Sequence, residues 1–171
     1  MSSIRLELFD SSHLAGFAAL AEDPLVLRFT RFPEHSPPGF AADWLARYEA
    51  GRCDGTREAF AILDATDGSF LGVAVAPEID RAARTAELGY VLAPAARGRG
   101  AATAALRQLT TWAFEELGAL RLELLIGVDN PASKRVAERC GYVREGVLRS
   151  LHFKGDLRDD TEIWSRLPTD P

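Results

Sequence analysis

The change of hydrophobic pattern at Pro94 constrains the fold more than any other feature of this sequence. Apolar side chains alternate with others over residues 85–92, which predicts a half-buried strand. After the proline they recur at every third or fourth position, at Ala102, Leu106, Leu109, Ala113 and Leu117. This spacing predicts an amphipathic helix from about Gly100 to Leu117, ended by Gly118. A strand therefore passes into a long helix through a short loop of glycine and arginine residues.

The rest of the chain predicts a single domain, residues 1–171, built around a mixed sheet. Apolar runs predict strands at 4–8, 59–63, 70–76, 85–92, 120–128, 142–151 and 161–167. Helical spacing and caps predict helices from about 12 to 21, 38 to 50 (ended by Gly51), 100 to 117 and 131 to 140. This order predicts an α/β (α+β) fold with a mostly antiparallel sheet of about seven strands. Helices should lie on both faces, because β-α-β crossovers need helical cover.

Size and composition exclude several classes of protein. The chain has 171 residues, 47% hydrophobic and 26% charged, enough to bury the core of one compact domain. Its longest uncharged stretches, such as 88–96, are about half the roughly 20 residues of a membrane-spanning helix. No apolar segment typical of a secretory signal follows the first charged residues, so we expect a cytoplasmic protein. Cys53 and Cys140 lack the spacing of a disulfide scaffold or a zinc site, so no metal is expected.

The distribution of charge says more about ligands than its total. The net charge of −5 disfavours nucleic acid and anionic membranes as partners. Between Arg97 and Lys154 the chain has 10 basic and 6 acidic residues, whereas the remainder has 10 basic and 19 acidic residues. The basic segment predicts a bound polyanion and the acidic remainder is free to attract a cation. Chance clustering of charge is the alternative.

The loop Arg97-Gly98-Arg99-Gly100 is predicted to bind a phosphate group. Its small residues let the backbone approach a ligand, and the free N–H groups and dipole of the following helix favour an anion. The loop lacks the GxxxxGK[ST] pattern of nucleoside-triphosphate sites, and Gly98, Gly100 and Thr103 do not have GxGxxG spacing. These residues alone leave open a glycine-rich helix start with two solvated arginines.

Two motifs resemble those of the GCN5-related N-acetyltransferase (GNAT) superfamily. Arg97-x-x-Gly100-x-Ala102 is similar to its Q/R-x-x-G-x-G/A signature, and about 30 residues later the run from Asn130 to Tyr142 resembles its second motif. The segments most similar to ribosomal-protein N-terminal acetyltransferases of the RimJ/RimL type are Asn130-x-x-Ser133, Glu87-Leu-Gly-Tyr90, Glu145-Gly146 and Gly155-x-x-Arg158-Asp159. The element order fits over the whole chain, whereas the specific motifs cover only residues 87–159.

The resemblance implies the GNAT fold and direct transfer of an acetyl group from acetyl-CoA to an amine. It implies that the cofactor pyrophosphate binds at Arg97, Gly98, Arg99, Gly100, Ala101, Ala102 and Thr103. The pantetheine arm would pair with the strand Tyr90-Val91-Leu92, and Asn130 and Ser133 would contact the cofactor. Asn130, followed by a proline, is also the predicted N-cap of its helix.

Glu87 and Ser133 are the candidate catalytic residues. Glu87 shares a strand face with Gly89, so its carboxylate would stand above a bare patch and take the proton of the amine through a water. In the family, a tyrosine that acts as the general acid usually stands at the position of Ala137. Ser133 lies one helical turn earlier, on the same face of the helix. The resemblance to RimL-type enzymes assigns protonation of the leaving thiolate to Ser133. The alternatives are a Glu87 paired with an arginine and a Ser133 that only hydrogen-bonds backbone.

The acceptor of the acetyl group is less defined. The resemblance places its pocket between residues 25–40, with Arg28, Phe29, Arg31 and Phe32, and residues 153–160, with Asp156, Asp159 and Asp160. The aspartates would favour an ammonium-bearing acceptor. A protein N-terminal amine, an aminoglycoside-like molecule and an amino-acid derivative stay open. His152 is expected at the surface, with a place in the acceptor pocket as the alternative, and Cys140 is expected in the core.

Two other functions stay open from the sequence. One is a catalytically weak acyl-CoA-binding module that regulates by ligand state, which would explain the anion loop and the missing tyrosine together. The presence of both Glu87 and Ser133 argues against it. The other is a nucleotide-phosphate binder of a different fold. The closing strand also offers an edge on which two copies could pair as a homodimer.

Overall fold

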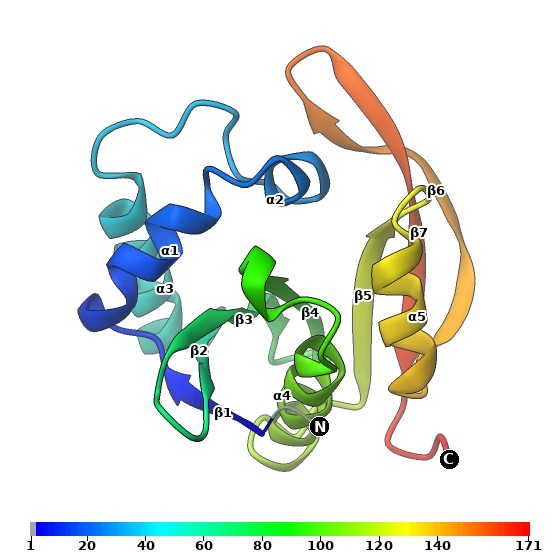
Figure 1. Ribbon diagram of the computed structural model, residues 1–171. Coiled ribbons are helices and arrows are strands. Elements are labelled where there is room, and N and C mark those ends of the chain that lie inside the picture. The colour runs from blue at the N-terminus through cyan, green and yellow to red at the C-terminus, as the bar shows by residue number, and fades with distance from the viewer. Residues whose placement is uncertain (1–2) are drawn as a thin grey trace.

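A seven-stranded sheet organises the protein (Figure 1). The computed structural model describes residues 3–171. The strands are β1 (Ile4–Leu8), β2 (Glu58–Asp64), β3 (Phe70–Asp80), β4 (Thr85–Leu92), β5 (Arg121–Gly127), β6 (Val143–Lys154) and β7 (Leu157–Arg166). They lie in the order β1-β2-β3-β4-β5-β7-β6, and every neighbouring pair is antiparallel except β4 and β5. The predicted mixed, mostly antiparallel sheet is confirmed.

Helices cover both faces of this sheet. Those in the described part of the chain are α1 (Leu14–Leu20), α2 (Pro24–Phe29), α3 (Phe40–Asp54), α4 (Ala101–Glu115) and α5 (Pro131–Arg139), with short 3-10 turns η1 (Ser11–His13) and η2 (Pro94–Ala96). One buried cluster lies between the sheet and α4 and α5, and a second lies between the sheet and α1 and α3. The expected arrangement of helices on both faces is therefore present.

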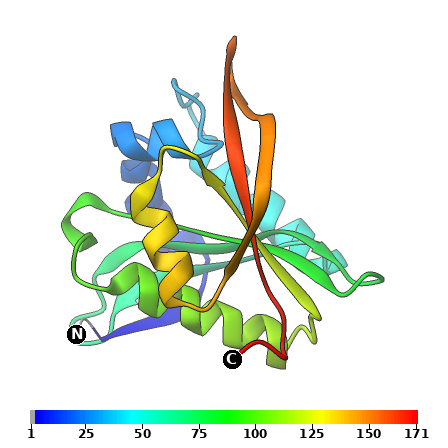
Figure 2. The same ribbon diagram turned by 90° about the vertical axis from the view of Figure 1, so that its right-hand side faces the viewer.

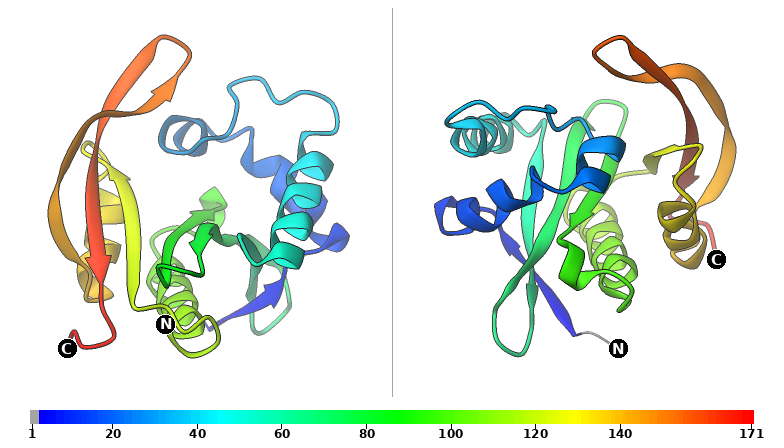
Figure 3. Two further views of the ribbon diagram at one scale, coloured as in Figure 1. Left: turned by 180° about the vertical axis from the view of Figure 1, so that it is seen from behind. Right: turned by 45° about the horizontal axis from the view of Figure 1, so that its top comes forward.

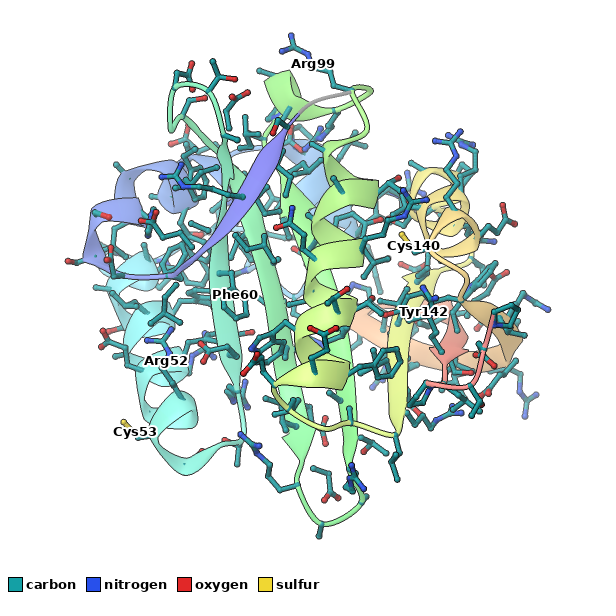
Figure 4. The ribbon with its side chains drawn as sticks, turned by 90° about the horizontal axis from the view of Figure 1, so that it is seen from below. Arg52, Cys53, Phe60, Arg99, Cys140 and Tyr142 are labelled. Carbon is teal, nitrogen blue, oxygen red and sulfur yellow. The ribbon has the colours of Figure 1, made fainter. Side chains whose placement is uncertain are left out.

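The alternation of side chains along β2 supplies both cores. Ala61 joins the cluster under α1 and α3, whereas Ile62 joins the cluster under α4. Phe60 packs edge-on against Trp112 of α4, with ring centroids 5.1 Å apart (Figure 4). Cys140 lies beside α4 and is only 2% exposed, which confirms its prediction as a core residue (Figure 4). Burial raises the pKa of its thiol.

Two helices differ from the sequence prediction. α3 does not stop at Gly51 but continues to Asp54 and ends at Gly55, whose φ of 76° is left-handed. Gly51 instead provides close packing, because a Cβ there would lie 2.5 Å from Cβ of Arg57. α2 was not predicted, because its six residues are too few for a helical period. Its N-terminus has local signals in Asp23, which caps it, and in a proline at the first turn.

β4 and β5 are paired over only part of their length. Thr85–Glu87 pair with Arg121–Glu123, and beyond them the two strands separate. Figure 1 shows β4 and β5 diverging, with α5, β6 and β7 on the β5 side, and the view from behind in Figure 3 shows the same separation. The β6–β7 hairpin extends well beyond the rest of the sheet (Figure 2). The sheet is thus split along its centre, which positions the site described next.

Candidate active site

A cavity of about 610 Å³ lies where β4 and β5 diverge. Its walls come from β4, β5, α2, α3, the loop after α2 and the β6–β7 hairpin. Of the predicted site residues, it brings together Glu87, Tyr90, Val91, Asn130 and Ser133. The glycine-rich loop lies outside the cavity lining, beyond the far end of β4. The site therefore has a cavity and a separate loop, joined by one strand.

Glu87 lines the cavity and also forms an ion pair. Its side chain is 18% exposed, and Nη2 of Arg31 lies 3.3 Å from Oε1 and 3.4 Å from Oε2. Burial raises the pKa of the Glu87 carboxyl, and the Arg31 guanidinium opposes this rise. Glu78 and Glu123 lie opposite Glu87 on the two neighbouring strands, and their negative charges raise its pKa further. The sequence left open whether Glu87 faces a cavity or pairs with an arginine. In the structure it does both.

Ser133 of α5 and Tyr90 of β4 bring two hydroxyl-bearing side chains to the cavity. Oδ1 of Asn130 accepts the backbone N–H of Ser133 at 3.1 Å, so the predicted N-cap is confirmed and the Ser133 hydroxyl is not needed for it. The Tyr90 hydroxyl is buried and has no hydrogen-bond partner among residues 3–171. Burial raises the pKa of Tyr90 to about 12, and the nearby Ser133 hydroxyl opposes the rise. From the sequence, Tyr90 was expected to contribute only its backbone, by pairing with the pantetheine arm, and its hydroxyl was not considered.

The loop before α4 has the geometry of an anion site. Gly98 and Gly100 have φ of 74° and 84°, and a Cβ at either position would meet no atom within 4 Å. Gly100 is the N-cap of α4 and provides no side-chain cap. The N–H groups of the first helical turn have no intrahelical acceptor. The first bond of this helix runs from the N–H of Ala104 to the carbonyl of Gly100, at 3.0 Å. Arg99 projects away from the fold (Figure 4).

Arg97 has a different role from the rest of the loop. Its Nη2 donates to Oδ1 of Asp23 at 2.7 Å and to the carbonyl of Leu92 at 2.9 Å. Its backbone N–H donates to the carbonyl of Pro94 at 3.2 Å. The guanidinium group and the backbone N–H of Arg97 therefore both donate to acceptors within the protein. In this way Arg97 fixes the loop to the end of β4 and to the N-cap of α2. It was predicted to bind the cofactor directly.

The acceptor side contains most of the expected residues and several that were missed. Arg28, Phe29, Arg31, Phe32, Phe153 and Asp159 line the cavity, whereas Asp156 and Asp160 do not. The missed residues include Trp44, Arg47 and Tyr48 of α3 and Arg57 before β2. No local pattern marks them, because only the packing of α3 on the sheet brings them to β4.

His152 also lines the cavity, so its expected surface role is wrong. Its Nε2 is buried and has no hydrogen-bond partner in the described part of the chain. Burial lowers the pKa of the imidazole below its usual value. Within residues 3–171, no three His, Cys, Asp or Glu side chains gather as a metal site. In the same residues, no helix has both the length and the apolar character to span a membrane.

Comparison with known proteins identifies the family. The model of the family described as "Acetyltransferase (GNAT) domain" matches residues 3–143. YdaF of Bacillus subtilis (strain 168) is 38% identical over 101 residues, which are 59% of this chain and 55% of YdaF. Ribosomal-protein-serine acetyltransferase of Escherichia coli (strain K12) is 32% identical over 101 residues, 59% of this chain and 56% of that protein. The chain spans little more than half the length of these curated relatives.

Solved structures share the fold at low sequence identity. Spermidine N-acetyltransferase from Vibrio cholerae, solved with CoA and spermine, matches 99% of this chain and 98% of its own with a TM-score of 0.87 and 21% identity. RimL, a ribosomal L7/L12 α-N-protein acetyltransferase solved with coenzyme A, matches 98% and 95% with a TM-score of 0.89 and 19% identity. Because the family model covers most of the chain, this protein belongs to the GNAT family, with RimJ/RimL-like similarity.

Proposed function

We propose that this protein transfers an acetyl group directly from acetyl-CoA to a primary amine. The observation that carries the proposal is the divergence of β4 and β5. Within residues 3–171, no strand pairs with the β5-facing edge of β4 beyond Glu87, as far as Leu92. An extended ligand with amide groups pairs with such an edge through main-chain hydrogen bonds. The pantetheine arm of acetyl-CoA is a ligand of this kind.

The two ends of the β4 edge supply the other requirements of the reaction. Gly98–Thr103 presents backbone N–H groups to a diphosphate at one end, and Glu87 presents a carboxylate at the other. A ligand held along the edge brings its thioester next to an amine in the cavity, and this proximity lowers the barrier. Both solved relatives named above were crystallised with CoA, which supports the same co-substrate here.

Acetyl transfer requires one proton to leave the amine and one proton to reach the sulfur. The amine nitrogen bonds to the carbonyl carbon, and the carbon–sulfur bond breaks. Glu87 accepts the first proton through a water, and the hydroxyl of Ser133 donates the second proton to the sulfur. The buried Tyr90 hydroxyl beside Ser133 would orient that donor. Together they would replace the tyrosine that the family usually has at the position of Ala137.

The test is amine-dependent release of CoA from acetyl-CoA. The panel contains peptides that begin with serine or alanine, spermidine, an aminoglycoside and free amino acids. We expect thiol release with at least one amine, an acetylated product in mass spectrometry, and CoA binding in calorimetry. Binding of acetyl-CoA without release for any amine would favour the regulatory acyl-CoA-binding module. Absence of CoA binding, or equally tight binding of ATP or NAD, would contradict the proposal.

A further inference from the structure

Positive charge is concentrated on the acceptor side of the cavity. Arg31, Arg47 and Arg57 come from the loop after α2, from α3 and from the loop before β2, and all three line the cavity. We call them the arginine cluster. Tyr48 lines the same cavity, and all three guanidinium groups lower the pKa of its hydroxyl, which burial raises to about 12. Arg31 forms an ion pair with Glu87, and Arg57 precedes Glu58, which lies opposite Ala76 of β3, two residues from the partner of Glu87 in that strand.

The carboxylates of the cavity do not balance this charge. Arg28, Arg31, Arg47, Arg57 and Lys154 line the cavity, against Glu87, Asp129 and Asp159. Arg28 pairs with Asp129, and Arg31 pairs with Glu87. Among residues 3–171, the ion pairs include neither Arg47 nor Arg57. Two guanidinium groups at the cavity wall are thus available to a ligand.

The arginine cluster is not placed for the phosphates of CoA. Its Arg31 forms an ion pair with Glu87, in the part of β4 that is paired with β5. The Gly98–Thr103 loop follows the opposite end of β4, beyond Leu92. At about 3.3 Å per residue, the backbone positions of Glu87 and Leu92 are roughly 16 Å apart along the strand. An anion bound by the cluster therefore belongs to the acceptor and not to the co-substrate.

We propose that the acceptor is an amine whose molecule also carries a carboxylate, which Arg47 and Arg57 bind while the amine faces Glu87. The proposal rests on the acetyl transfer proposed above and narrows its substrate class. Guanidinium groups bind carboxylates through paired, charge-assisted hydrogen bonds. The Tyr48 hydroxyl can donate to the same anion. Polyamines, which bring only positive charge, are disfavoured by the same arginines.

The shape of the cavity suits a carboxylate next to an apolar group. Phe29, Phe32 and Trp44 line it together with the arginine cluster. Free amino acids and acidic peptide N-termini both place a carboxylate close to an amine. The experiment therefore uses both, each with a neutral partner of matched size. Phenylalanine is compared with phenethylamine, and a peptide amide beginning Ser-Asp is compared with one beginning Ser-Asn.

The variant R47Q/R57Q removes the two free charges. In the wild type we expect kcat/KM for the carboxylate-bearing member of at least one pair to exceed that for its neutral partner at least tenfold. A charged hydrogen bond of about 1.5 to 3 kcal/mol corresponds to roughly 10- to 150-fold. The variant should lose most of this preference through a lower kcat/KM for the carboxylate-bearing member, and it should bind CoA as before. R47K/R57K should restore part of the preference.

R149Q is the matched control. Arg149 is exposed on β6, outside the cavity lining, so its loss should change neither the preference nor CoA binding. Calorimetry of phenylalanine and phenethylamine with CoA-saturated protein tests the same selectivity without turnover. Equal or better use and binding of the neutral partners, or a preference for spermidine, would overturn this inference and leave acetyl transfer intact. Selective binding of the carboxylates without acetylation of any amine would support the inference and contradict the proposed function.

Discussion

Glu87 is subject to two opposing effects whose balance decides whether it can serve as a base. Burial and the two neighbouring glutamates raise the pKa of its carboxyl, and Arg31 lowers it. The net rise brings the proton affinity of the carboxylate closer to that of a base that works near neutral pH. A glutamate on an open strand face, with only solvent around it, would lack this property.

Replacing Glu87 by glutamine should lower kcat about 100-fold, because it removes the proton acceptor and keeps the size of the side chain. The pH dependence of kcat gives the sharper test. In the wild type, kcat should fall as pH decreases through the raised pKa of Glu87. In R31Q the opposing charge is gone, so this pKa rises further and the acid limb moves to higher pH. An acid limb that is unchanged in E87Q would contradict the assignment of Glu87 as the base.

Replacing Ser133 by alanine should lower kcat about 10- to 100-fold, at the low end of acid catalysis. The change should leave α5 intact, because the Asn130 cap uses the backbone N–H of Ser133 and not its hydroxyl. Tyr90→Phe should cause a smaller loss, because it removes only the neighbouring hydroxyl. Single-turnover kinetics and thermal unfolding would separate chemistry from stability. A wild-type kcat in S133A would reject Ser133 as the proton donor.

At the scale of elements, a side chain at Gly100 should impair the binding of CoA at the loop before α4. The φ of 84° costs about 1 to 2 kcal/mol for a residue with a Cβ, although that Cβ would meet no protein atom. In Gly100→Ala we therefore expect a modest loss of stability and a loss of CoA affinity of at least about tenfold, because the methyl group enters the space of the anion. Calorimetry with CoA measures this change.

Gly68→Ala is the matched control for that variant. Gly68 has a φ of 75°, in the turn between β2 and β3, so its substitution carries similar strain away from the loop. G68A should lose stability and keep its CoA affinity. Equal loss of CoA affinity in both variants would show that strain, and not the anion site, explains the result at Gly100.

The accuracy of the sequence predictions also varied by element, for physical reasons. Residues 85–92 were predicted with the bounds that β4 has, because the alternation there is regular and Pro94 ends it. The end of α3 was wrong because Gly51 has a packing role that only the position of Arg57 explains. β7 was predicted to begin at Thr161, but it begins at Leu157, where exposed residues extend the hairpin and no apolar pattern marks them.

At the scale of the whole molecule, the charge count gave no indication of the arginines that reach the cavity. The part of the chain outside residues 97–154 is strongly acidic, which left it free to attract a cation, and Asp156, Asp159 and Asp160 predicted an ammonium-bearing acceptor. Folding brings four arginines of that same part, Arg28, Arg31, Arg47 and Arg57, to one cavity. Net charge describes an average over the surface, whereas a site depends on which side chains long-range packing brings together. The loop at residues 97–100 was recognisable because its residues are adjacent in sequence, and its binding of an anion stays a prediction.

Asp23 connects the two halves of the site, and its substitution tests that connection. Its carboxylate caps α2, whose residues line the acceptor cavity, and binds Arg97, which fixes the loop before α4 to β4. Asp23→Ala should lower the free energy of unfolding by about 1 to 3 kcal/mol, through the lost cap and the unpaired, partly buried Arg97. Urea unfolding measures this loss.

The same variant should raise both the KM for the acceptor and the Kd for CoA, because one carboxylate positions α2 and the loop together. Asp54→Ala is the control, since Asp54 caps only the exposed turn at Thr56. It should change neither constant. If Asp23→Ala lowers stability but leaves both constants as they are, then α2 and the loop keep their positions without this carboxylate, and Arg97 serves the loop through Leu92 alone.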